Sequence, residues 1–158
     1  MQLDLSGNQL CGVKYGEGTY TAEGITAIAD ALHVNGALTA LDLSSNCLKD
    51  EGVSAVCAAI QSNKETKLAS LNFYYNDIGT VGANAVAAMV AVTGGLTALD
   101  LSFNDLNDDG VSAVCEAIQS NKETKLASLN FRNNGIGLVG SKSVAAMVAV
   151  TGALTEVR

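Results

Sequence analysis

Few side chains in this sequence are suited to catalysis. Its one histidine, His33, has no serine or cysteine nucleophile assigned to it, and neither a metal-binding cysteine cluster nor a hydrolase serine motif is present. A glycine-rich insertion at 11–20 lacks the Gly-Lys-Ser/Thr triplet of a phosphate-binding loop, so we interpret it as a surface loop and not as a new element. The sequence therefore predicts a protein that is not an enzyme and needs no cofactor.

One set of polar residues recurs at regular intervals and could contact a ligand. Its members are Asp4, Asp42, Asn72, Asp100 and Asn130. On adjacent parallel strands, carboxylates two strands apart are separated by about 10 Å, too far to share a metal ion with ligand distances of about 2.4 Å. We therefore predict no metal site. Two compatible interpretations stay open: an acidic floor for a basic partner, and solvated carboxylates hydrogen-bonded to neighbouring serine and asparagine.

Large side chains occupy positions just after the same predicted strands. These residues are Tyr74, Tyr75, Phe103 and Arg132, where several equivalent positions hold serine or glycine. Neighbouring strands lie about 4.8 Å apart, so the four side chains can form one patch. Tyrosine and arginine are enriched at the energetic centres of protein interfaces, which makes this the predicted partner-binding site. The alternative is that the rings merely cover neighbouring aliphatic surface.

These residues are placed by a repeating pattern of leucines and one asparagine. Residues 38–48 contain the spacing Leu38, Leu41, Leu43, Asn46, Leu48. Further copies begin at Leu68, Leu96, Leu126 and Leu154, so the successive steps are 30, 28, 30 and 28 residues. A pattern that recurs at this period indicates one structural unit stacked many times.

Each repeat has the pattern of a short strand followed by a helix. The alternation Leu41-Asp42-Leu43 points two leucines into a core. Val53, Val56, Cys57 and Ile60 lie at i, i+3, i+4 and i+7 and therefore share one helix face. Between strand and helix comes an asparagine whose amide can satisfy the backbone groups of stacked turns. This predicted structural column is Asn8, Asn46, Asn76, Asn104 and Asn134.

The pattern resembles that of leucine-rich repeat proteins, most of all the ribonuclease-inhibitor-like group, whose repeats are near 28 residues with a full helix. The resemblance implies an α/β fold: a right-handed solenoid, or horseshoe, with an inner parallel sheet and outer helices. We expect one domain, 1–158, made of repeats 1–37, 38–67, 68–95, 96–125, 126–153 and a partial repeat 154–158. Proteins of this kind are known for enzyme inhibition, immune sensing and activation of small GTPases.

Residues 38–95 and 96–153 align without a gap and are identical at 45 of 58 positions. None of the 13 differences falls on a strand leucine or on the asparagine column, and seven fall in or just after the strands. The strand leucines and the asparagines of the column are therefore the same in both copies, whereas surface residues at the strand ends differ. We therefore expect recognition to depend on these changed positions.

The charge of the chain restricts its partners. A net charge of −7 disfavours nucleic acid and anionic membranes and favours a neutral or basic protein. The longest apolar run, 85–92, is far short of the roughly 18 residues that a membrane span needs, and the start of the chain does not resemble a secretory signal. We interpret the four cysteines as free thiols and predict a cytoplasmic, intracellular location, although a Cys11–Cys47 disulfide is conceivable.

The predicted function is that of a protein–protein interaction module that binds through the concave parallel sheet. One alternative is a GTPase-activating role like that of the Ran GTPase-activating proteins, whose residues no motif here matches. Another is a spacer segment of a larger leucine-rich repeat protein. Because the sequence starts and stops within a strand pattern, we also expect either a fragment of a longer protein or self-association through uncapped ends.

Overall fold

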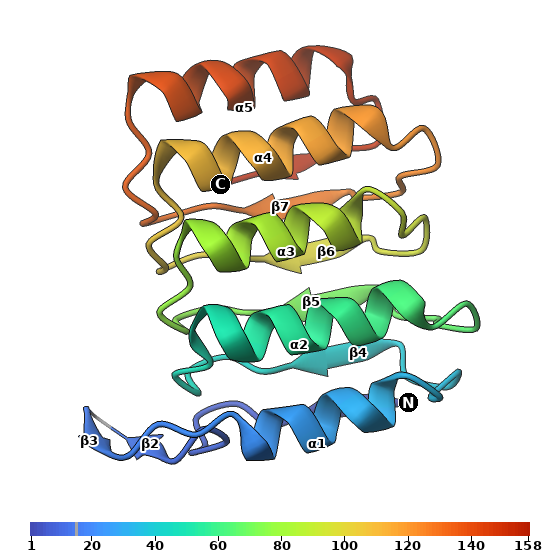
Figure 1. Cartoon of the computed structure of the whole chain (residues 1–158). Coiled ribbons are helices and arrows are strands. Elements are labelled where there is room, and N and C mark those ends of the chain that lie inside the picture. Colours follow the sequence, from blue (N-terminus) through green and yellow to red (C-terminus); the bar gives the residue numbers. More distant parts are fainter. Residues whose placement is uncertain (15) are drawn as a thin grey trace.

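Strands and helices alternate along the chain in the computed structural model, which describes residues 1–14 and 16–158 (Figure 1). The main sheet consists of β1 (Gln2–Asp4), β4 (Ala40–Asp42), β5 (Ser70–Asn72), β6 (Ala98–Asp100), β7 (Ser128–Asn130) and β8 (Glu156–Val157). The helices are α1 (Glu23–Leu32), α2 (Lys49–Ser62), α3 (Thr80–Val90), α4 (Asn107–Ser120) and α5 (Leu138–Val150). Every neighbouring pair of strands in this sheet is parallel.

Equivalent residues of successive repeats lie side by side in the sheet. Leu41 pairs in register with Leu71, and Leu99 pairs with Leu129. Each of these leucines is buried, whereas the residues on either side of it are half-buried and point to the other face. Residues one full repeat apart in the sequence therefore form columns across the sheet.

The helices form a single layer along one side of the sheet (Figure 1). Each helix contacts only the helices of the adjacent repeats, as stacking of similar units requires. The core lies between the two layers, where Leu41 of β4 and Leu43 just after it share one buried cluster with the α2 residues Val53 and Val56. The predicted α/β solenoid of leucine-rich repeats is confirmed.

Asparagines of the column make hydrogen bonds within their own turn and to neighbouring turns. The Asn104 amide group donates to the carbonyls of Phe73, Leu101 and Ser102 at 3.0–3.2 Å. Its Oδ1 accepts from the backbone N–H groups of Asn76 and Ile78 at 2.9 and 3.1 Å. Each asparagine inside the array therefore joins its own turn to those of neighbouring repeats.

The first asparagine of the column makes fewer hydrogen bonds than the others. Asn8 is exposed and donates only to the carbonyls of Leu5 and Ser6 in its own turn. The next member, Asn46, is buried, but its Oδ1 has no hydrogen-bond partner among the described residues. The turn of the first repeat therefore makes fewer hydrogen bonds to its neighbour than the later turns make.

That insertion contains a small antiparallel hairpin, so the prediction of a loop without a new element is wrong. β2 (Val13–Lys14) pairs with β3 (Glu17–Gly18), and Gly16 and Gly18 adopt φ values of +82° and +108°. Such φ values suit glycine, and they allow the chain to reverse within a few residues. Tyr15, which also belonged to the predicted loop, lies outside the described residues.

Tyr20 attaches the hairpin to the array. Its hydroxyl donates to the Leu48 carbonyl at 2.8 Å, and the Lys49 ammonium lies 4.7 Å from the centre of its ring. Burial is the main reason why the pKa of Tyr20 rises to about 12, so the hydroxyl keeps the proton that it donates. The insertion is therefore held against the start of α2.

Candidate functional site

The four large side chains at the strand ends are in mutual contact. The rings of Tyr74 and Tyr75 have centroids 6.0 Å apart, and the rings of Tyr74 and Phe103 meet edge to face at 5.2 Å. The Arg132 guanidinium lies 5.5 Å from the centre of the Phe103 ring. We call Tyr74, Tyr75, Phe103 and Arg132 the aromatic patch. It crosses three repeats without interruption.

The members of the aromatic patch support one another and still face solvent. An edge-to-face ring pair contributes about 0.5–1.5 kcal/mol beyond its buried area, and an exposed cation–π contact about 0.5–1 kcal/mol. Tyr74 and Phe103 are half-buried, whereas Tyr75 is 57% exposed and Arg132 is also exposed. The rings therefore do pack on one another, and much of the patch stays available to a partner.

Two of the aromatic residues have an unusual backbone conformation. Tyr75 and Phe103 have φ values of 52° and 56°, the left-handed region. Gly7 and Asn133 hold the same turn position in other repeats and suit this conformation better. A bulky residue there costs about 1–2 kcal/mol. Such strained positions are concentrated at functional sites, which makes the aromatic rings at this turn notable.

The polar column of the sheet lies beside the aromatic patch and positions it. The Asn72 Oδ1 accepts the backbone N–H of Tyr74 at 2.9 Å, and the Asn130 Oδ1 accepts that of Arg132 at 3.1 Å. The amide groups of the same two asparagines donate to Asp42 and Asp100, each at 2.9 Å. All four polar side chains are half-buried. These hydrogen bonds agree with the second interpretation of the column and leave the first open.

His33 has a serine neighbour that the sequence did not reveal. Its Nδ1 lies 2.7 Å from the Ser62 Oγ, although 29 residues separate the two in the chain. The Ser62 hydroxyl donates to the Ala59 carbonyl at 3.0 Å, so the histidine nitrogen is the donor in the contact with Ser62. A serine held in this way is not activated as a nucleophile. The pair links the ends of α1 and α2.

Within the described residues, other common kinds of site are not found. Among the side chains at 1–14 and 16–158, no group of three or more metal-ligating residues could hold an ion. Across the same residues, no helix combines the length and the apolar character needed to cross a bilayer. The pockets and the aromatic patch are thus the features from which a function has to be argued.

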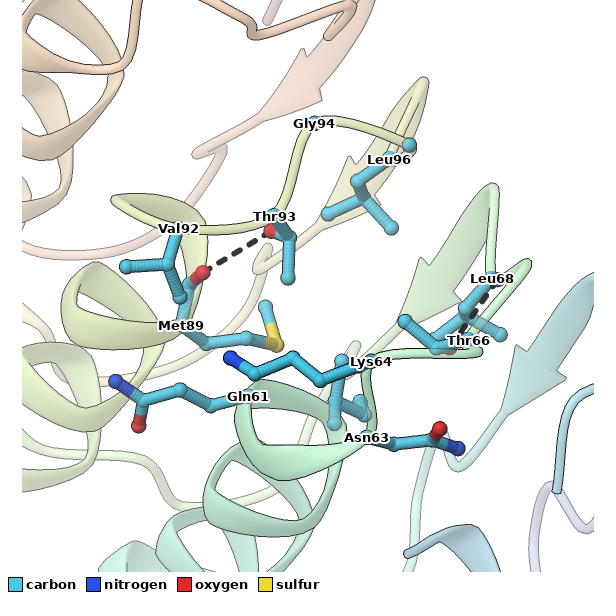
Figure 2. Close-up of a pocket in the computed structure, with 12 residues that line it drawn as sticks. Gln61, Asn63, Lys64, Thr66, Leu68, Met89, Val92, Thr93, Gly94 and Leu96 are labelled. Carbon is cyan, nitrogen blue, oxygen red and sulfur yellow. Dashed lines mark hydrogen bonds between the residues drawn. The ribbon is translucent and has the colours of Figure 1, made fainter. Parts of the chain in front are cut away.

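One pocket, of about 180 Å³, lies between the ends of α2 and α3 and the loops that follow them (Figure 2). The Lys64 side chain extends across it toward Met89 (Figure 2). Of its 12 lining residues, 11 recur unchanged 58 positions later, and Gly95, which corresponds to Ala153, is the exception. Because nearly the same residues occur at the equivalent place in the second copy, this pocket is a feature of the repeat and is not specific to one part of the chain.

A larger pocket, of about 480 Å³, lies between the hairpin and the turns that follow β1, β4 and β5. We call it the hairpin pocket. Its lining residues are Gly7, Asn8, Val13, Gly16, Ser45, Cys47, Tyr75 and Asp77. Four of them fall in the 38–95 copy, and all four differ from their equivalents Phe103, Asp105, Asn133 and Gly135. Sequence comparison flagged these changes but could not show that they meet.

The comparison with protein families agrees with the fold. A family model described as "Leucine Rich repeat" matches residues 37–57, 64–87 and 96–115. The chain is 38% identical over 95 residues to human "NACHT, LRR and PYD domains-containing protein 13", and 30% identical over 129 residues to mouse "NACHT, LRR and PYD domains-containing protein 12". These matches cover 60% and 82% of the chain. They cover 9% and 12% of those proteins.

Two further similarities support the type of repeat. Mouse "Ribonuclease inhibitor" is 28% identical over 119 residues, which is 75% of this chain and 26% of that protein. The solved structure of "Leiomodin-1 Actin-Binding Site 2 (ABS2)" superposes with a TM-score of 0.67 at 17% identity, covering 94% of this chain and 78% of that one. At that identity the likeness to leiomodin-1 shows the fold alone. The chain spans about a tenth to a quarter of the sequence relatives, so their activities are not carried over.

Proposed function

This chain belongs to the ribonuclease-inhibitor-like group of leucine-rich repeat proteins, and we propose that it binds a protein partner through the concave sheet. The aromatic patch is the centre of the proposed interface. The observation that carries this proposal is the mutual contact of Tyr74, Tyr75, Phe103 and Arg132 at one exposed edge of the sheet. Tyrosine and arginine are enriched among the few residues that supply most of the binding energy of an interface.

Preorganisation supports the same proposal. Binding normally costs side-chain conformational entropy, about 0.5–1.5 kcal/mol for each flexible side chain that becomes fixed. In the aromatic patch the rings already restrain one another, and backbone hydrogen bonds to Asn72 and Asn130 fix the residues that carry Tyr74 and Arg132. The interface therefore has less freedom to lose when a partner binds.

The charge of the chain supports a partner of neutral or basic character. The net charge is −7, and Asp42 and Asp100 lie half-buried on the same face as the aromatic patch. A positively charged surface would approach this face with favourable long-range attraction, whereas nucleic acid and anionic lipid would be repelled. An intracellular location is part of the proposal, and the four unbridged thiols support it.

The other candidate functions have less support. GTPase activation has no residue motif or pocket in its favour, and we propose binding without catalysis. A pure spacer would need no aromatic residues on strained backbone, so the exposed Tyr75 and the half-buried Phe103 argue against that alternative.

The test is partner capture with a variant that uses residues already present in the repeats. Tyr74→Ser together with Phe103→Ser introduces the serines found at Ser44 and Ser45, so the frame should be retained. The immobilised chain is exposed to a cell extract, and retained proteins are quantified by mass spectrometry. We expect the double variant to retain about tenfold less of each protein that the wild type captures, because two residues at the centre of the proposed interface are lost.

The control replaces two apolar side chains by serine on the helical side. Val81→Ser changes a residue in the first turn of α3 and Val92→Ser one just after α3, and the two side chains are 66% and 58% exposed. Capture by this variant should match the wild type. Equal capture by the wild type and the Tyr74, Phe103 double variant would refute a binding role for the aromatic patch and favour the spacer.

A further inference from the structure

We infer that the hairpin pocket receives an arginine side chain of the protein partner, with the Asp77 carboxylate as its counter-charge and the Tyr75 ring as one wall. This inference rests on the proposed function, because it specifies what the partner presents beside the aromatic patch. The two surfaces share Tyr75. A partner chain lying on the aromatic patch is therefore adjacent to the opening of the hairpin pocket.

The lining of the hairpin pocket has the character that a guanidinium group needs. Tyr75 supplies an aromatic face, Val13 supplies aliphatic surface, and Asn8 and Ser45 supply polar atoms. Asp77 is exposed, and it is the one carboxylate among the lining residues that the structure describes. It is also the one charged residue of the described lining.

The nearby basic residue Lys49 is engaged elsewhere. Its ammonium group lies over the Tyr20 ring, 4.7 Å from the centroid. Within the described residues, the ion pair formed at 4 Å or less is Arg158 with Glu156, at the other end of the array. Asp77 takes no part in that ion pair.

Cys47 does not compete as a second anion. Burial, followed by the nearby Asp77 carboxylate, raises the pKa of the Cys47 thiol above its ordinary value. The thiol is therefore neutral at pH 7, and it adds a small apolar surface to the pocket. Asp77 remains the charge that a ligand would meet.

Arginine fits these walls better than the other cationic side chain. Its guanidinium is planar, stacks on an aromatic face and can donate two hydrogen bonds to one carboxylate, whereas the lysine ammonium is a compact and strongly hydrated charge. Tyr75 offers the face and Asp77 offers the carboxylate within one pocket. A neutral side chain of the same shape would use the ring and leave the carboxylate unpaired.

The second copy of the repeat pair shows that this pocket is specific to one place. The positions equivalent to Ser45, Cys47, Tyr75 and Asp77 all carry a different residue, and the 11–20 hairpin has no counterpart there. In contrast, the lining of the pocket in Figure 2 is almost unchanged between the copies. The part of the hairpin pocket that comes from the 38–95 copy is therefore unique to that copy, as expected for a specific contact.

The experiment uses capped arginine, N-acetyl-arginine methylamide, as the probe and capped citrulline as its neutral isostere. Backbone amide NMR signals of the full chain are followed during titration with each compound. We expect saturable shifts centred on Tyr75 and Asp77, with capped arginine binding about fivefold or more tightly than capped citrulline. Equal binding of the two compounds would overturn the inference.

Two variants locate the binding. Asp77→Asn removes the charge and retains a residue that tolerates the φ of 56°, and Tyr75→Asn installs the residue found at Asn133. Each should weaken capped arginine by about fivefold or more. Asp105→Asn is the control, since it removes an exposed carboxylate outside the pocket and should change nothing. An unchanged affinity in Asp77→Asn would overturn the inference.

A third variant separates this inference from the proposed function. Phe103→Ser alters the aromatic patch without altering the lining of the hairpin pocket. It should reduce partner capture and leave capped-arginine binding unchanged. Loss of arginine specificity with partner capture intact refutes the pocket alone. Unchanged capture in Phe103→Ser, with arginine specificity intact, counts against the aromatic patch alone.

Discussion

At Tyr75 and Phe103 the chain places an aromatic residue where Gly7 and Asn133 show that a small or polar residue suffices. The backbone at this turn has a positive φ in every repeat. Aromatic residues do not favour this conformation, so the rings are not needed to form the turn. The proposed contact with a partner would give the two rings a role at this turn.

Single asparagines of the column should contribute strongly to stability. In Asn104→Ala, three carbonyls and two N–H groups lose their side-chain partner in a buried turn. Several of these groups would be left unsatisfied at a cost of about 1–3 kcal/mol each, partly relieved by water. We expect the free energy of unfolding to fall by about 3 kcal/mol in urea denaturation.

Asn8→Ala provides the matched control for Asn104→Ala. Asn8 is exposed and bonds only to carbonyls of its own turn, where water can replace it. The change should lower the free energy of unfolding by less than about 1 kcal/mol. Similar losses in the two variants would show that hydrogen bonding between repeats does not dominate the role of the column.

At the scale of elements, α2 and α4 each supply an aspartate that caps the next helix in the chain. The N-termini of α3 and α5 have no capping side chain of their own. The Asp50 Oδ1 accepts the N–H groups of Gly79 and Gly82 at 2.8 Å. Asp108 accepts those of Gly137 and Val139 at 2.6 and 3.2 Å. These aspartates satisfy free N–H groups and bring negative charge to the positive helix end.

The Asp108 cap predicts a dependence of stability on pH. The hydrogen bond from the Gly137 N–H is the main cause that lowers the pKa of Asp108 below its ordinary value. A group with a lowered folded-state pKa stabilises the fold above its unfolded pKa, near 4, and loses this contribution as the pH falls through the folded-state pKa. We expect the urea midpoint of the wild type to fall more steeply below about pH 4 than that of Asp108→Asn.

Asp109→Asn is the control for the pH measurement, since Asp109 is an exposed carboxylate in the same helix turn. Its midpoint should follow the wild type throughout the acid range. Parallel pH curves for the wild type and Asp108→Asn would show that the cap across repeats makes no titratable contribution.

Close packing between helices α3 and α4 depends on a glycine. A Cβ atom added at Gly110 would lie 2.8 Å from the Ala83 Cβ and 3.2 Å from the Leu106 Cβ. Alanine normally stabilises a helix relative to glycine by about 1 kcal/mol, but here the neighbouring helix would have to move. We expect Gly110→Ala to lower the free energy of unfolding by about 1–3 kcal/mol, measured by denaturation.

Gly152→Ala is the counterpart of that change, because a Cβ there would have no heavy atom within 4 Å. Its free energy of unfolding should stay within about 0.5 kcal/mol of the wild type. A stability gain in Gly110→Ala would mean that helix propensity, and not contact between repeats, decides the effect at this position.

On the scale of the whole molecule, stacking leaves one face of α5 open in this chain. Val148 is 50% exposed, whereas the equivalent Val90 of α3 is 2% exposed beneath α4. Ala145 is likewise exposed, and its equivalent Ala87 is buried. Exposed apolar surface of this kind favours association, so the expectation of self-association becomes specific to this face.

We expect the average mass in sedimentation equilibrium to rise above 16.1 kDa as the concentration increases. Val148→Lys should reduce this rise, because a charge would have to be buried between the copies. Val81→Lys, at a site 66% exposed on a helix inside the array, should leave it unchanged. A mass of 16.1 kDa at every concentration would contradict the prediction.

Much of the frame could be predicted from the sequence because its contacts repeat. Leu41, Leu71, Leu99 and Leu129 occur at equivalent positions, and stacking similar units brings such residues into register without further information. The aromatic patch followed from the same columns, since neighbouring strands fix the spacing of residues one repeat apart. Its role as a binding site stays a prediction.

The hairpin, its attachment through Tyr20 and the hairpin pocket could not be predicted in this way. The 11–20 insertion occurs once, so no repeating pattern shows where it folds back, and the contact of Tyr20 with Leu48 joins residues 28 positions apart. The same limit applies to Ser62 beside His33 and to the caps from Asp50 and Asp108. Periodicity determines which residues share a face, whereas only the three-dimensional path of the chain determines which side chains and backbone groups meet across it.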